Sequence, residues 1–151
     1  MNLLMCALIV SLLAPTIQRL PPLLIGTWNV EKPYNTPGPI GIDDKEEHLI
    51  LGIHIIYSRD HLHVCGKDVP AESLKVESLS ANEFLRKYGF MPDVIGLGKA
   101  TVTEVTVGAS HRVNACNLHG VYGAPGAHVF MDKEEHFVIE IGNAYYPLKR
   151  A

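Results

Sequence analysis

Residues 24–31 read Leu24-Ile25-Gly26-Thr27-Trp28-Asn29-Val30-Glu31 and have the pattern that indicates the class of fold. Alternate positions differ in polarity, because Trp28 and Val30 fall on one face and Thr27 and Asn29 fall on the other. Successive side chains of a β-strand point to opposite sides of the sheet. The segment is therefore predicted to be a strand with one buried face.

Short runs of β-forming residues recur through the rest of the chain, separated by turn residues. The predicted strands cover residues 53–57, 61–65, 73–79, 101–107, 111–116, 128–131, 137–141 and 145–148. The first two are expected to form a hairpin across Ser58-Arg59-Asp60, and Gly142-Asn143 is a hairpin signal near the end. This regular spacing predicts a mostly β fold, an antiparallel barrel of about eight strands with two short helices.

The two helices are predicted from their capping residues. Asp43 or Asp44 can cap a helix that ends at Gly52, since a side-chain carboxylate accepts from the free amides of the first turn. Residues 80–83, with Ser80 and Glu83 at its ends, have the spacing of a capping box for a second short helix. Prolines and glycine in residues 33–39 stop both helix and sheet, which predicts a long loop.

One domain is expected from 151 residues of which 47% are apolar. Residues 1–13 contain no charged side chain and are too short to span a bilayer comfortably, which suits the apolar part of a secretory signal. The prediction is a signal peptide over about residues 1–20, cleaved between Thr16 and Pro22, and a single domain over 21–151. A retained anchor or a buried N-terminal helix is the alternative.

Loss of residues 1–20 removes one charged side chain, Arg19, and leaves 12 basic against 16 acidic residues. That balance favours neither nucleic acid nor an anionic membrane surface as a partner. The mature region keeps two cysteines, Cys65 and Cys116, and an oxidising compartment is expected to join them. The chain is accordingly predicted to be secreted or periplasmic.

The opening Gly26-Thr27-Trp28 on the first strand resembles the G-x-W motif of the calycin group, the lipocalins and their bacterial lipocalin-like relatives. In that group the Trp packs across the barrel floor. The resemblance implies an apolar cup that holds a ligand, or a barrel that presents its loops to a partner protein. Trp28 is also expected in the core of any fold, because burying so large a ring is stabilising.

Aromatic residues are the candidates for contact with a small apolar ligand in the barrel: Trp28, Tyr34, Tyr57 and Tyr146. Trp28 is placed at the closed end and the loop of residues 33–42 near the mouth. Tyrosines suit a recognition surface, but a plug at one end of the barrel is the favoured alternative for Tyr145 and Tyr146.

Histidines supply a candidate metal site, for zinc or copper. His61 and His63 share one strand face, with a third ligand from His54, His119, His128 or His136. If Leu62 and Val64 face the core, the alternative is a polar strand face exposed to solvent.

No catalytic motif accompanies these residues: neither a nucleophile elbow nor a phosphate-binding loop is found, and no cofactor is predicted. The acidic clusters 43–47 and 132–135 are expected in solvated turns. The function expected is that of an exported, non-catalytic, lipocalin-like binding protein. The alternatives are a protein-interaction or inhibitor module that binds through residues 33–39 and 91–98, and a histidine-based metal-binding protein.

Overall fold

The fold is described by a computed structural model that covers residues 18–108, 114–118 and 123–151. Within these residues the chain forms nine strands: β1 (Gly26–Val30), β2 (His54–Tyr57), β3 (His61–Val64), β4 (Lys67–Pro70), β5 (Leu74–Leu79), β6 (Val102–Val107), β7 (His128–Met131), β8 (Phe137–Ile141) and β9 (Ala144–Arg150). The helices are α1 (Asp44–Leu51) and α2 (Ala81–Tyr88), with 3-10 turns η1 (Pro22–Leu24) and η2 (Pro92–Ile95). None of the helices described there is long and apolar enough to cross a membrane.

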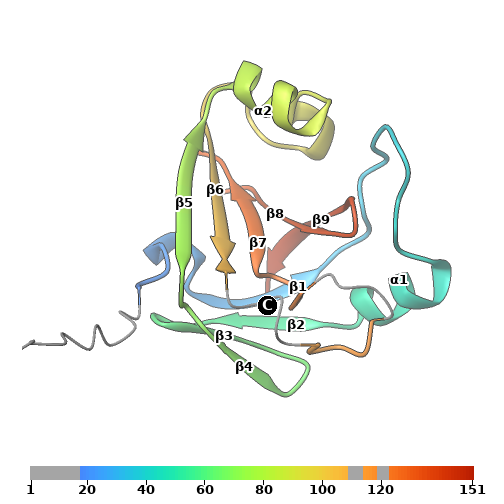
Figure 1. Ribbon diagram of the computed structural model, residues 1–151, viewed down its shortest axis with the longest axis vertical. Helices are drawn as coiled ribbons and strands as arrows, with labels where there is room; N and C mark the ends of the chain where they lie inside the picture. Colours follow the sequence, from blue (N-terminus) through green and yellow to red (C-terminus); the bar gives the residue numbers. More distant parts are fainter. Residues whose placement is uncertain (1–17, 109–113, 119–122) are drawn as a thin grey trace, which may run out of the picture.

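All nine strands belong to one antiparallel sheet in the order β4-β3-β2-β1-β9-β8-β7-β6-β5. The two edge strands, β4 and β5, follow one another in the chain and are joined only by residues 71–73. A connection this short spans about 14 Å even when fully extended. The sheet must therefore curl until its edges approach at that end, and the result is a half-barrel (Figure 1). The predicted mostly β, antiparallel, barrel-like fold is confirmed.

The inner face of the curled sheet holds the larger core cluster. Ile55 on β2, Val64 on β3 and Ile139 on β8 are fully buried there, as the alternation of each strand requires. The outer face of β6–β9 is also covered, by α2 and η2, and Phe84 of α2 packs there against Phe130 of β7. Strands β7 and β8 are consequently buried on both faces, which explains their almost continuous apolar sequences.

Both predicted helices begin at their expected caps. Asp43 accepts a hydrogen bond from the Glu46 amide at 2.8 Å, and Ser80 accepts one from the Glu83 amide at 3.2 Å. In each helix the Glu side chain accepts from the amide of the cap residue, which completes the capping box. Gly89 ends α2 with a φ of 84°, a conformation that side chains disfavour and glycine allows.

The predicted disulfide is confirmed: Cys65 and Cys116 are bonded, with their Cα atoms 5.3 Å apart. The bond joins the β3–β4 turn to the segment between β6 and β7, two places far apart in the strand order. It closes a loop with a sequence separation of 51 residues. On the chain-entropy model such a crosslink stabilises the fold by about 4 kcal/mol.

Two strands differ from the prediction. Strand β4 was not expected, because Val69 is its only buried apolar residue and Pro70 is a poor strand former. The strand predicted at residues 111–116 is wrong for residues 114–116, which have no regular structure, and its residues 111–113 lie outside the described residues. Here the disulfide, rather than a ladder of hydrogen bonds, holds the backbone in place.

The described fold includes Gln18–Leu20, three residues ahead of the domain start predicted from the sequence. The Gln18 amide donates to the Ala71 carbonyl at 3.1 Å, and the Leu20 amide donates to the Arg59 carbonyl at 2.9 Å. The Leu20 side chain is buried in the inner core. Cleavage of a leader peptide itself stays a prediction.

Candidate functional site

Trp28 lies at one end of the inner core, where it is sealed from solvent. Its indole N–H donates to the Leu24 carbonyl at 2.8 Å, and its ring packs against Phe137 with the centroids 4.5 Å apart. The Arg150 guanidinium lies over the ring, 4.4 Å from its centroid, and donates to the carbonyl oxygens of Leu23 and Ile25. Residues from the two ends of the described chain thus close this end of the half-barrel together.

The four predicted ligand-contact residues do not form one group. Trp28, Tyr57 and Tyr146 are all buried in the inner core, whereas Tyr34 packs against the core under α2. Tyr57 donates from its hydroxyl to the Gly126 carbonyl at 2.6 Å, and burial raises its pKa. Within the described residues the Tyr146 hydroxyl has no hydrogen-bond partner. That these side chains contact a ligand stays a prediction.

A surface pocket of about 470 Å³ lies next to the end that Trp28 closes. It is lined by Arg19, Leu20, Pro21, Pro22, Ile25 and Arg59. Four of these side chains are apolar and two carry a permanent positive charge. Among the residues that the structure describes, no ion pair joins either guanidinium to a carboxylate. The pocket therefore offers apolar contact together with two positively charged groups.

A second, shallower groove of about 400 Å³ lies between α1 and the outer surface of β2 and β3. It is lined by Leu49, Gly52, Ile53, His54, Ile56, His63, Cys65 and Gly66. Leu49 and Ile56 are 50% and 39% exposed, so the groove has an apolar floor. His54 and His63 are the polar groups along it, and the disulfide lies at its edge.

His61 and His63 project from the outer face of β3, as the alternation predicts, because Leu62 and Val64 are buried on the inner face. Each imidazole is paired with a carboxylate: His61 Nδ1 lies 2.8 Å from Asp60 Oδ1, and His63 Nδ1 lies 2.7 Å from Asp68 Oδ1. Asp68 comes from β4, directly opposite His63 in the ladder. The pairing of His63 with Asp68 was not predicted, because strand β4 itself was not predicted.

Of the other described histidines named as third ligands, His54 lines the same groove as His63, and the rest lie elsewhere. His54 is on the outer face of β2, while His128 lies under α2 and His136 in the β7–β8 turn. His119 is outside the described residues.

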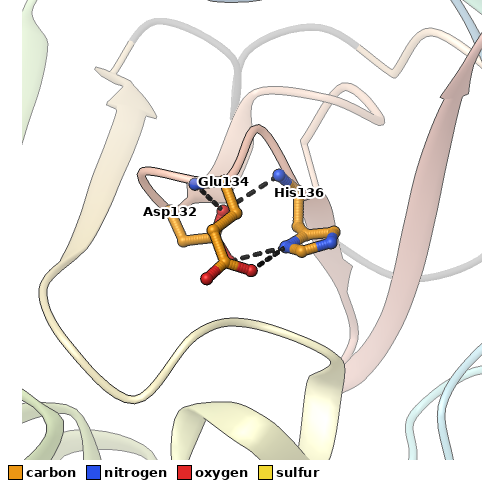
Figure 2. A group of neighbouring side chains, drawn as sticks. All are labelled: Asp132, Glu134 and His136. Atoms are coloured by element: carbon orange, nitrogen blue, oxygen red, sulfur yellow. Dashed lines mark hydrogen bonds and ion pairs between the residues drawn. The ribbon is translucent and has the colours of Figure 1, made fainter.

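Asp132, Glu134 and His136 form the described group whose ligand atoms converge most closely, within 4.8 Å of one another (Figure 2). The Asp132 carboxylate already accepts four hydrogen bonds, from the amides of Gly98, Glu134 and His136 and from His136 Nδ1. Burial disfavours its charge, but these bonds dominate and lower its pKa. The hydrogen bond to Asp132 raises the pKa of His136. The His136 ring thus occupies one side of the Asp132 carboxylate, and the group joins the β7–β8 turn to the segment before β6.

A partly buried ionic network lies between the sheet and α2. His128 of β7 bridges two carboxylates on neighbouring strands, with Nε2 2.8 Å from Glu104 Oε1 and Nδ1 2.9 Å from Glu140 Oε2. Lys87 of α2 donates to Glu104 Oε2 at 2.7 Å, and the Tyr88 hydroxyl donates to Glu104 Oε1. Both nitrogens of His128 are engaged, so this imidazole has no free lone pair with which to act as a general base.

Charge pairing in this network shifts two pKa values strongly. Burial opposes the charge on His128, but its bonds to Glu104 and Glu140 outweigh that effect and raise its pKa to about 9. Burial likewise opposes the charge on Glu104, and its bonds to His128, Lys87 and Tyr88 lower its pKa to about 2. Sequence reasoning missed the network. Its one visible signal is Glu104, a charged residue inside an otherwise apolar and Thr-rich strand.

The comparisons with known proteins found no relative: no family model, no curated protein and no solved structure matches the chain. The chemistry of the site therefore has to be argued from the side chains alone.

Proposed function

We propose that the chain is an exported, lipocalin-like binding protein that takes a small amphipathic anion, an apolar body with one carboxylate or similar group. The observation that carries this proposal is the pocket of about 470 Å³ in which Arg19 and Arg59 flank an apolar wall. Ligand sites are typically concave and mostly apolar, with a few polar groups that fix orientation. A guanidinium binds a carboxylate through two parallel hydrogen bonds, which supplies that orientation.

The proposed site is outside the barrel because the inner face is filled. Tyr57, Tyr146 and Ile139, large side chains at the centre of that face, are at most 1% exposed. A ligand inside the barrel would have to displace these side chains, at a cost of several kcal/mol for each cavity that it opened. The pocket beside Trp28 requires no such displacement.

Three features support the wider assignment. Gly26-Thr27-Trp28, the residues that carry the resemblance, begin the first strand of a curled antiparallel sheet, and Trp28 is buried in its inner core. The disulfide between Cys65 and Cys116 is typical of proteins in an oxidising compartment. The apolar residues 1–13 suit a leader peptide.

The test is binding of 11-(dansylamino)undecanoate, followed by energy transfer from Trp28, the chain's single tryptophan. The acid should bind to one site, and its methyl ester should bind at least about tenfold more weakly because it lacks the charge. Arg59→Gln and Arg19→Gln should each weaken binding of the acid about three- to tenfold. Arg86→Gln, an exposed arginine on α2, is the matched control.

Equal affinity of acid and ester, or equal loss with Arg86→Gln, would contradict an anion site at this pocket. Unchanged thermal unfolding of each variant has to accompany the comparison, so that reduced binding is not caused by misfolding.

A protein-interaction surface is the second candidate, and one contact favours it. Tyr34, from the first of the two loops predicted to bind a partner, passes so close to Gly96 in the second that a Cβ at Gly96 would clash with the Tyr34 ring. The two loops therefore lie side by side, and Ile40 and Val94 near them are 47% and 37% exposed. Each loop therefore offers an exposed apolar side chain for contact with a partner.

A photoreactive side chain at Ile40 or Val94 would test this surface in the exported protein fraction. A partner should give the same crosslinked mass from both positions and none from Leu85, which is 39% exposed on α2. Crosslinks of equal yield from Leu85 would indicate nonspecific contact and remove the second candidate.

A further inference from the structure

The β3–β4 hairpin brings together two imidazoles and a carboxylate on one exposed face. His61 and His63 are alternate residues of β3, and Asp68 of β4 is the ladder partner of His63. The pleat directs all three side chains to the outer side of the sheet, since Leu62 and Val69 occupy the inner side. Two neutral nitrogen ligands and one anionic oxygen ligand are the set that zinc and copper prefer.

The distances from Asp68 to the two imidazoles are close to the spacing of two ligands around one ion. Asp68 Oδ1 lies 2.7 Å from His63 Nδ1 and 3.9 Å from His61 Nε2. With metal bonds of about 2.0–2.1 Å, two ligands of a tetrahedral ion are about 3.3 Å apart. The two distances lie on either side of that value. The side chains of His61, His63 and Asp68 are 39%, 40% and 70% exposed, so small rotations can adjust them without disturbing the core.

His61 is also held in the orientation of a metal ligand. Its Nδ1 is hydrogen-bonded to Asp60 Oδ1 at 2.8 Å, which leaves Nε2 on the side of Asp68. Histidines that bind a metal through one nitrogen almost always donate the other N–H to a carboxylate, carbonyl or water, which fixes the tautomer. Asp60 therefore acts as a positioning residue, and its charge with that of Asp68 balances a divalent ion.

The Asp132 group is the competing location, and its chemistry is less suitable although its ligand atoms are closer together. The four hydrogen bonds that Asp132 accepts hold a turn in place, and His136 Nδ1 is one of the donors. A metal ion there would have to break part of that arrangement. At the β3–β4 hairpin an ion replaces only contacts between exposed side chains.

From this geometry we infer a binding site for one divalent transition-metal ion on the outer face of the β3–β4 hairpin, with His61, His63 and Asp68 as ligands and solvent completing the coordination. The inference does not depend on the proposed anion pocket, which shares none of these residues. Zn²⁺ should bind, and Cu²⁺ should bind more tightly, in the order general for nitrogen and oxygen ligands.

The experiment is calorimetric titration of the mature protein, purified without an affinity tag, with Zn²⁺ in a buffer that does not chelate it. One ion per chain is expected. His63→Gln, His61→Gln and Asp68→Asn should each reduce the affinity at least about thirtyfold. Asp60→Asn should reduce it about tenfold, because the charged hydrogen-bond partner that orients the His61 ring is lost. Binding should release protons and weaken as the pH is lowered, because bound imidazoles are neutral.

His136→Gln is the matched control, since it removes a histidine with a carboxylate partner from the competing group. It should leave the Zn²⁺ affinity unchanged. The inference is overturned if no Zn²⁺ binds, or if His136→Gln abolishes binding that His61→Gln and His63→Gln retain. Trp28 fluorescence and thermal unfolding in the absence of metal should be the same for all variants, because the substituted side chains lie outside the core.

Discussion

The guanidinium of Arg150 lies 4.4 Å from the centroid of the Trp28 ring, and so joins the last strand to the first. The same guanidinium donates to the carbonyl oxygens of Ile25 and Leu23, 3.1 and 3.0 Å away, which fixes the segment that enters β1. One side chain thus connects β9, β1 and η1 at the end of the half-barrel where the proposed ligand pocket lies.

Replacing Arg150 should weaken this end of the molecule. Arg150→Ala removes a cation–π contact and two hydrogen bonds, and we expect the free energy of unfolding to fall by about 1–2 kcal/mol. Arg150→Lys should restore only part of the loss, because an ammonium cannot reach both carbonyl oxygens as the planar guanidinium does. Urea unfolding followed by Trp28 fluorescence measures both changes. Equal free energies of unfolding for the wild type, Arg150→Ala and Arg150→Lys would show that the contacts of Arg150 contribute nothing to stability.

Removing the disulfide should destabilise the fold more than any single surface change. The double variant Cys65→Ser/Cys116→Ser loses the crosslink between the β3–β4 turn and the segment after β6. We expect the free energy of unfolding to fall by about 2–4 kcal/mol. The wild-type protein in reductant should unfold at the same denaturant concentration as the variant. A difference between them would indicate that the serines, rather than the missing bond, cause the effect.

Stability should depend on pH through His128 and Glu104. The pKa of His128 rises from 6.5 to about 9 on folding, so its contribution is complete below about pH 6.5 and is lost as the pH rises through 9. The pKa of Glu104 falls from 4.5 to about 2, so its contribution is present above about pH 4.5 and is lost as the pH falls toward 2. The protein should be most stable between about pH 5 and 6.5.

The variant His128→Gln tests that assignment. It should lower stability at pH 6, on the order of 2 kcal/mol, because Glu140 loses its cationic partner and Glu104 keeps only Lys87. The variant should also lose most of the decline in the free energy of unfolding between pH 6.5 and 9. Urea unfolding at each pH measures this change. His48→Gln, on the exposed side of α1, should preserve the wild-type profile.

The N-terminus of the mature protein should lie ahead of Gln18. Chains that begin at residue 21 lose the two backbone hydrogen bonds of Gln18 and Leu20 and the buried Leu20 side chain. We expect them to be about 2–4 kcal/mol less stable than chains that begin at residue 17. Mass spectrometry of the protein isolated from the producing cells and from their medium gives the position of any cleavage directly. A mature chain that begins at Pro21 or Pro22 with full stability would contradict this expectation.

Local patterns determined which segments became strands and helices. The alternation around Trp28 and the β-rich run ending at Val107 gave strands close to the predicted bounds, and the capping boxes at Asp43 and Ser80 started the two helices. Such signals are readable because the period of side-chain burial and the bonds of a cap involve residues only a few positions apart. The pairing of Cys65 with Cys116 was predicted for a different reason, since no other cysteine remains after residue 20.

Tertiary structure alone decided what these elements bring together. Strand β4, with a single buried apolar residue, forms because β3 offers it an edge, and it supplies Asp68 to His63. The Glu104–His128–Glu140 network forms because β6, β7 and β8 are neighbours beneath α2. Strand order and sheet curvature arise from contacts between residues distant in the chain, and no local pattern encodes them. Each side chain of the pocket, the network and the proposed metal site can therefore be found in the sequence. Which of them lie close together is decided only by the fold.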